Sequence, residues 1–314
     1  MRSFRWAFPA LALGLLPAFA MAQGAFDRAI NDSDIRRAEQ TRLGAVTSEE
    51  AGGWDIEINL PLSWTSNAVQ QFGEQADVVG PPKSDWHVTP DALLRYTYQF
   101  DWVKLSAKLD VGEDRYFQQI TVNQDAVYAT LKAEFTDGRS DIFVPYVAYT
   151  PEVDFLPFFA HWQASLQDFY GGFTSGIGFK DAKLARYADA IDSGDWSMLF
   201  DVRAGQRLAA PSAFENTFFR VSADIIYVVK PELSFWLTGA YRYRHYPDFF
   251  GDVRHDSRLS AITRAVWTPD WLTRRIKSAE ISFEVAWYKN YSNIASERYT
   301  SWELGPSVLL AWHF

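Results

Sequence analysis

The chain of 314 residues contains no cysteine and only three methionines. Without cysteine the protein can form no disulfide, no thiol nucleophile and no cysteine-ligated metal centre. After the first 22 residues it also lacks any run of 18 apolar residues, which excludes a membrane-spanning helix in that part of the sequence. Aromatic residues nevertheless make up 17% of the chain and include 13 tryptophans. The sequence therefore needs a fold that exposes many aromatic side chains without a long apolar segment.

Residues 1–22 are predicted to be an export signal. Arg2 and Arg5 supply a positive start, an apolar run extends from Trp6 to Phe19, and small residues around position 21 form a cleavage site. This layout is typical of a secretory signal peptide, with an uncleaved anchor as the alternative. Removal of the two arginines takes the formal net charge from −9 to −11. A charge this negative argues against nucleic acid as a partner.

Residues 23–53 form a polar segment that ends in two glycines. Phe26, Ile30 and Ile35 have a weak helical spacing. We expect a short periplasmic lead or a plug inside a pore, with a disordered tail as the alternative.

From Trp54 onward the hydrophobic period becomes two. In residues 54–64 every even position is apolar, and the odd positions are Asp, Glu, Asn, Pro and Ser. Such alternation places one face of a strand in lipid and the other in a polar interior. A strand of this length crosses a tilted bilayer, whereas strands of soluble proteins usually have about five or six residues.

The same alternation recurs in further segments as far as the last residue. We therefore predict an all-β fold, a transmembrane up-and-down antiparallel β-barrel of about 12 strands over residues 54–314. Closure of the barrel leaves no strand edge exposed to lipid. The second strand is expected to run without interruption from Trp86 to Phe100. Residues 180–195 break the rhythm, and their apolar spacing is typical of a small helix.

Aromatic residues are expected at the two membrane interfaces. Trp54 and Trp64 are ten residues apart on one face, as are Trp302 and Trp312, and ten tilted residues span about 25 Å. The alternative is that these side chains pack inside a soluble core. The predicted membrane girdle consists of Trp54, Trp64, Trp86, Trp267, Trp287, Trp302, Trp312 and Phe314.

The last ten residues, Gly305 to Phe314, read GPSVLLAWHF. They resemble the C-terminal recognition strand of bacterial outer-membrane proteins, which ends in an aromatic residue preceded by alternating hydrophobics. The resemblance implies insertion by the barrel-assembly machinery, location in the outer membrane of a Gram-negative bacterium, and periplasmic N- and C-termini. The resemblance extends to the barrel architecture expected for residues 54–314, but it identifies no subfamily.

Seven arginines are predicted to face the interior: Arg203, Arg207, Arg220, Arg242, Arg244, Arg258 and Arg264. Guanidinium groups bind carboxylate or phosphate with two hydrogen bonds, and the walls of a pore focus their field. We therefore predict a channel for passive uptake of small anionic solutes. In architecture it is similar to twelve-stranded porins for acidic oligosaccharides, which use arginine tracks. The alternative is that the arginines pair with acidic residues and merely fill a narrow barrel.

Two other functions remain open. If Trp64 pairs with Trp86, then Ser63 lies opposite His87, and the nearby Asp91 completes a set of nucleophile, base and orienting acid for a lipid hydrolase. A structural or assembly barrel without a channel is the third possibility. No cofactor and no metal are predicted, because His245 and His255 flank an outer loop and lack the spacing of metal ligands.

Overall fold

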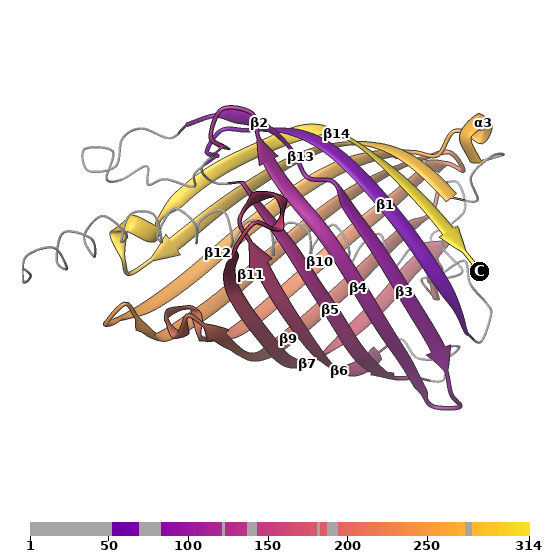
Figure 1. Ribbon diagram of the computed structural model, residues 1–314. Coiled ribbons are helices and arrows are strands. Elements are labelled where there is room, and N and C mark those ends of the chain that lie inside the picture. Colours follow the sequence, from indigo (N-terminus) through magenta and orange to yellow (C-terminus); the bar gives the residue numbers. More distant parts are fainter. Residues whose placement is uncertain are drawn as a thin grey trace, which may run out of the picture.

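The computed structural model describes residues 52–68, 83–120, 123–136, 143–180, 183–186, 194–273 and 278–314. The predicted signal peptide and all but the last two residues of the predicted lead lie outside these ranges. Long strands inclined to a common axis form the wall of a barrel in Figure 1.

The strands follow one another along the chain and are joined by turns, loops and short helices. The first seven are β1 (Gly52–Thr65), β2 (Asp85–Val88), β3 (Asp91–Gln99), β4 (Val103–Tyr116), β5 (Gln124–Phe135), β6 (Phe143–Phe155) and β7 (Trp162–Lys180). The others are β8 (Lys183–Arg186), β9 (Trp196–Ala210), β10 (Asn216–Lys230), β11 (Leu233–Phe249), β12 (Asp252–Trp267), β13 (Ser278–Ser292) and β14 (Tyr299–His313). The helices are α3 (Asp270–Thr273), η2 (Pro157–Phe159), η4 (Ser212–Phe214) and η5 (Ala295–Glu297).

In the described ranges the strands make a closed antiparallel barrel of 12 strands, as predicted. Strands β2 and β3 both lie between β1 and β4 and count as one interrupted strand, while β8 pairs only with β7. Pairing of β1 with β14 closes the barrel. At the end of this seam the amide of Trp54 donates to the carbonyl of Phe314 (3.0 Å), and the amide of Phe314 donates back (2.9 Å). The backbone of the last residue is therefore part of the closure.

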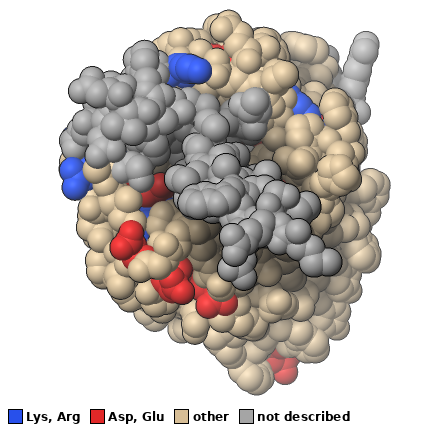
Figure 2. All heavy atoms as spheres, turned by 60° about the vertical axis from the view of Figure 1, so that its left-hand side comes forward, with Lys and Arg blue, Asp and Glu red and all other residues tan. Residues whose placement is uncertain are grey.

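The two faces of the wall differ as the alternation predicts. On β1, Trp54 and Leu60 are about half exposed, whereas Asn59 and Ser63 on the other face are buried. The visible flanks of the barrel are almost free of charged atoms in Figure 2. Among the aromatics expected at the interfaces, exposed side chains belong to Trp54, Trp86, Trp267, Trp302 and Phe314, and half-buried ones to Trp64, Trp287 and Trp312.

Two local predictions were wrong. The second strand is interrupted at Thr89 and Pro90, because proline has no amide hydrogen for the ladder. The expected helix in residues 180–195 is contradicted at Lys183–Arg186, where β8 pairs with the end of β7. Of the helices in the described ranges, none is long and apolar enough to span a membrane.

Glycine allows the strands to approach closely at the closing seam. A Cβ atom at Gly305 would lie 1.9 Å from the carbonyl oxygen of Leu62 and 2.8 Å from the Cα atom of Ser63. Both neighbours are backbone atoms of β1, so neither can move aside by a side-chain rotation. The seam therefore requires glycine at this position, as sharply bent barrel walls often do.

We predict that Gly305→Ala weakens the closed barrel by about 1–3 kcal/mol, because the added methyl group must push β1 away from β14. The loss is measured as a lower urea midpoint and lower heat resistance on electrophoresis of the refolded protein. Gly239→Ala on β11 is the matched control, since a Cβ there meets no atom within 4 Å. Equal losses in the two variants would contradict the steric explanation.

Candidate functional site

Four of the seven predicted arginines stand side by side on neighbouring strands. Arg220 on β10 is the cross-strand partner of Arg203 on β9 and of Arg242 on β11. Arg242 is in turn the partner of Arg258 on β12. Adjacent strands lie about 4.8 Å apart, so this arginine row, Arg203–Arg220–Arg242–Arg258, extends for about 14 Å around the wall.

The arginine row belongs to the inner face of the wall. Arg220, Arg242 and Arg258 are buried, with 7%, 9% and 4% of their surface exposed, and Arg203 is half-buried. The neighbours in sequence point the other way, because Phe219 and Tyr241 are among the exposed hydrophobics of the outer face. The strand alternation thus turns all four guanidinium groups inward.

Aromatic rings flank both ends of the row. The Arg203 guanidinium lies 5.3 Å from the centre of the Tyr170 ring. At the other end, Arg258 lies 4.6 Å from the ring of Tyr288 and 5.9 Å from that of Tyr299. Cation–π contacts of this kind hold a guanidinium in place while leaving hydrogen-bond donors at its edge.

The row brings four like charges close together on the inner face. Like charges at directly opposed positions of a sheet destabilise the pair, and here three such pairs follow one another. The effect is stronger inside a protein than in water because the dielectric constant is lower. Such an arrangement can instead attract and hold an anion, whose charge relieves the repulsion.

Other inward arginines are engaged in ion pairs with carboxylates. Arg207 donates from Nε and Nη2 to the two oxygens of Asp168, both at 2.6 Å. Arg264 donates to Oε2 of Glu284 at 2.8 and 3.2 Å. Arg244 lies opposite Asp256 in the register. For Arg207 and Arg264 the structure therefore agrees with the alternative of charge pairing within the barrel.

A further arginine anchors β12 near the β11–β12 hairpin. Arg254 is fully buried, donates to Asp256 at 2.9 Å, forms an ion pair with Glu297 at 2.8 Å, and lies over the rings of Tyr246 and Phe249. Burial alone would lower the pKa of Arg254, but the charges of Glu297 and Asp256 outweigh burial and raise it. The group therefore stays charged and ties the β11–β12 hairpin to η5.

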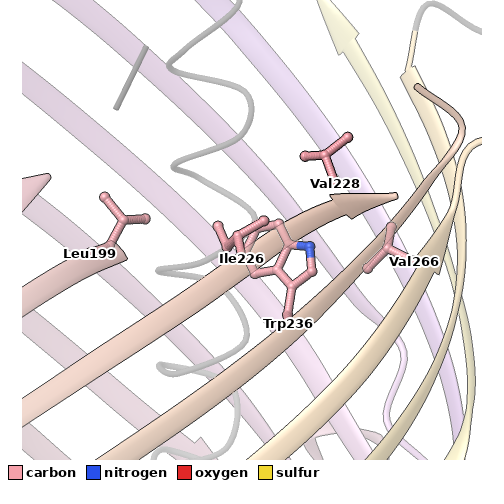
Figure 3. Close-up of a cluster of buried hydrophobic side chains, with 5 residues drawn as sticks. All are labelled: Leu199, Ile226, Val228, Trp236 and Val266. Atoms are coloured by element: carbon pink, nitrogen blue, oxygen red, sulfur yellow. The ribbon is translucent and has the colours of Figure 1, made fainter. Parts of the chain in front are cut away.

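The inner wall is apolar at another level of the same strands. Leu199, Ile226, Val228, Trp236 and Val266 form a buried cluster. Figure 3 shows their side chains on β9, β10, β11 and β12, the four strands that carry the arginine row. The wall thus presents cationic and apolar zones, rather than a uniform polar lining.

The structure tests the register assumed for the hydrolase alternative. Trp64 pairs with Trp86 and Ser63 lies opposite His87, as predicted. Asp91, however, accepts a hydrogen bond from Asn59 at 3.0 Å. The acid beside His87 is Asp114, whose Oδ1 is 2.9 Å from Nδ1 of the imidazole.

The acid that the structure places beside His87 is thus Asp114 rather than the expected Asp91, because β4 lies on the other side of β2. His87 also stacks on Tyr116, with ring centres 4.8 Å apart. Within the described ranges Ser63 and His87 are opposed but share no hydrogen bond. Asp114 therefore orients the imidazole of His87, but Ser63 makes no hydrogen bond to that imidazole.

No protein-family model and no curated protein matches the chain. Solved barrels are similar to it only at low identity. The translocator domain of the autotransporter NalP from Neisseria meningitidis has 9% identity and a TM-score of 0.43, covering 91% of this chain and 98% of that one. The KdgM porin in complex with oligogalacturonate has 8% identity and a TM-score of 0.38, covering 80% and 97%. Outer membrane phospholipase A from Escherichia coli has 11% identity and a TM-score of 0.42, covering 81% and 89%.

Neutralisation of Arg207 tests its ion pair with Asp168. We predict that Arg207→Gln lowers the unfolding free energy by about 3 kcal/mol, because the half-buried Asp168 carboxylate loses its partner. Lys230→Gln should change it little, since the Lys230–Glu232 pair is exposed. Urea unfolding in vesicles, followed by tryptophan fluorescence, measures both. Equal losses in the two variants would contradict a stabilising role of the Arg207–Asp168 pair.

Proposed function

We propose that the protein is an outer-membrane channel for passive uptake of small anionic solutes. The observation that carries the proposal is the arginine row on the inner wall. The apolar outer face and its exposed aromatics support a position in a bilayer. In this proposal both chain ends of the barrel lie on the periplasmic side. The seam with Phe314 supports insertion of the terminal strand by the barrel-assembly machinery.

The row suits a solute that carries carboxylate or phosphate groups. Each guanidinium offers a planar fork of donors, and the next fork is only about 4.8 Å away. The row lies at one level of the wall, so an anion that passes through the lumen meets several donors there at once. Positively charged side chains grouped in this way select anions in pores, provided that each contact is weak enough to release the ion. The half-buried Tyr170 at one end of the row adds a flat ring against which an uncharged part of the solute can lie.

Planar-bilayer recordings test the channel. We expect the protein to conduct with a reversal potential that indicates preference for anions. The double variant Arg220→Gln/Arg242→Gln should lose most of this preference, because half of the row is neutralised. Lys230→Gln is the matched control: it removes one positive charge from an exposed side chain at the β10–β11 turn and should leave selectivity unchanged. Preference for cations, or absence of conductance in the unaltered protein, would rule out the proposal.

A lipid hydrolase is the second candidate function, favoured by the pairing of His87 with Asp114. In that function Asp114 orients the imidazole, and His87 takes the proton of Ser63 as the hydroxyl attacks an ester carbonyl. All three side chains are buried on the inner face, so an acyl chain would have to enter the barrel. The missing hydrogen bond between Ser63 and His87 makes this function the weaker of the two.

Hydrolysis of labelled phospholipid and lipid A by the refolded protein tests this second function. If it is correct, Ser63→Ala and His87→Ala should each abolish release of fatty acid, and Asp114→Asn should reduce it strongly. Asp91→Asn should have little effect, since Asp91 is bonded to Asn59 instead. If the unaltered protein leaves both lipids intact, the hydrolase is excluded. A barrel without either activity would have a structural or assembly role.

A further inference from the structure

Two histidines meet on the outer side of the β11–β12 hairpin. His245 on β11 and His255 on β12 are cross-strand partners, although ten positions separate them in sequence. Their Nδ1 atoms are 3.2 Å apart, and their rings stack with centres 4.7 Å apart. No metal was predicted here, because the two histidines lack the sequence spacing of metal ligands; the register of the hairpin nevertheless brings their side chains together.

The pair lies beyond the part of the hairpin that crosses the bilayer. Strands β11 and β12 contain 17 and 16 residues, about six more than a membrane crossing needs. His245 is the thirteenth residue of β11, and it alternates with the inward Arg244. Both imidazoles are thus on the outer face, where His255 is exposed and His245 is half-buried.

The surroundings hold both histidines on a rigid frame. The amide of His255 donates to Oδ1 of Asn293 at 2.6 Å, and the amide of Asn293 donates back to the carbonyl of His255 at 3.2 Å. On the inner side of the same hairpin, Arg254 is fixed by Asp256 and Glu297. The two imidazoles are therefore positioned before any ligand arrives, which lowers the entropic cost of binding.

Three polar atoms converge at His255. Its Nδ1 is 3.2 Å from Nδ1 of His245 and 2.8 Å from the hydroxyl of Tyr243. An imidazole nitrogen carries either one lone pair or one hydrogen, so it makes one good hydrogen bond in its plane. A single proton cannot serve both contacts, whereas a metal ion can accept a lone pair from each of the three atoms.

We propose that His245 and His255, with Tyr243 as a third and weaker ligand, form a surface site for a divalent transition metal ion such as Cu²⁺ or Zn²⁺. Imidazole nitrogen suits these ions, whereas Mg²⁺ and Ca²⁺ take oxygen ligands. Two nitrogens bound at about 2.1 Å in tetrahedral geometry are about 3.4 Å apart, close to the separation found here.

The rings stack with an interplanar angle of 20°, so both must turn out of the stacked arrangement before their lone pairs point to one ion. In the described part of the chain no third His, Cys, Asp or Glu side chain joins the pair. Solvent or an external ligand therefore completes the coordination, as in sites with open positions.

Titration of the untagged, full-length barrel in detergent with Cu²⁺ tests the site, with electron paramagnetic resonance as the readout. We expect one Cu²⁺ per chain with two nitrogen donors. His245→Gln and His255→Gln should each weaken binding at least tenfold and remove the two-nitrogen signal, whereas Tyr243→Phe should weaken it less. His161→Gln is the control, because it removes an exposed histidine of the β6–β7 loop and should change nothing.

Heat resistance on electrophoresis shows in parallel that each variant is folded. Cu²⁺ bound with two nitrogens in the His245→Gln variant would overturn the proposal, because the ion would then be elsewhere. Absence of stoichiometric Cu²⁺ binding to the unaltered protein would also overturn the proposal. The two histidines would then be only a pair of stacked rings. Conductance of the channel should not depend on these variants, so the outcome is independent of the proposed function.

Discussion

A strand in lipid must satisfy every backbone amide and carbonyl within the protein, because hydrocarbon offers no hydrogen-bond partner. This constraint explains why the β1–β14 seam extends to the last residue, with reciprocal bonds between Trp54 and Phe314. It also explains why Gly305 lies where β14 approaches β1 too closely for a side chain. Once the wall is closed, the alternation of the strands assigns each side chain either to lipid or to the interior, and function is confined to the inner face and the ends.

On the inner face, the barrel uses arginine in two different ways. Arg207, Arg264 and Arg254 each bind carboxylates that face them, so their burial is compensated within the wall. The arginine row places four guanidinium groups side by side on successive strands, with aromatic rings at its two ends. Such a row concentrates positive charge and hydrogen-bond donors on one part of the inner face, and the proposed passage of anions rests on this property.

The sequence predicted the barrel, its twelve strands and the direction in which most side chains face, because a period of two is a local property. It predicted the opposition of Ser63 and His87 for the same reason, since Trp64 and Trp86 indicated the register. Aligning the aromatic ends of other hairpins, such as Trp196 with Tyr227, would have revealed the contact between Arg203 and Arg220 as well. The sequence therefore contains the information on this arginine pair, but it can be read only by aligning neighbouring strands with each other.

Other features depend on strands that are distant in sequence or on irregular backbone. Asp114 reaches His87 because β4 pairs with the side of β2 that faces away from β1, where Tyr116 is the cross-strand partner of His87 and Asp114 lies two positions before it. His245 meets His255 because the hairpin continues well past the bilayer. In both cases the ladder, rather than spacing along the chain, brings the groups together. A search for sites in such barrels should therefore follow rows across strands, because each row holds side chains that share one level of the wall and one face.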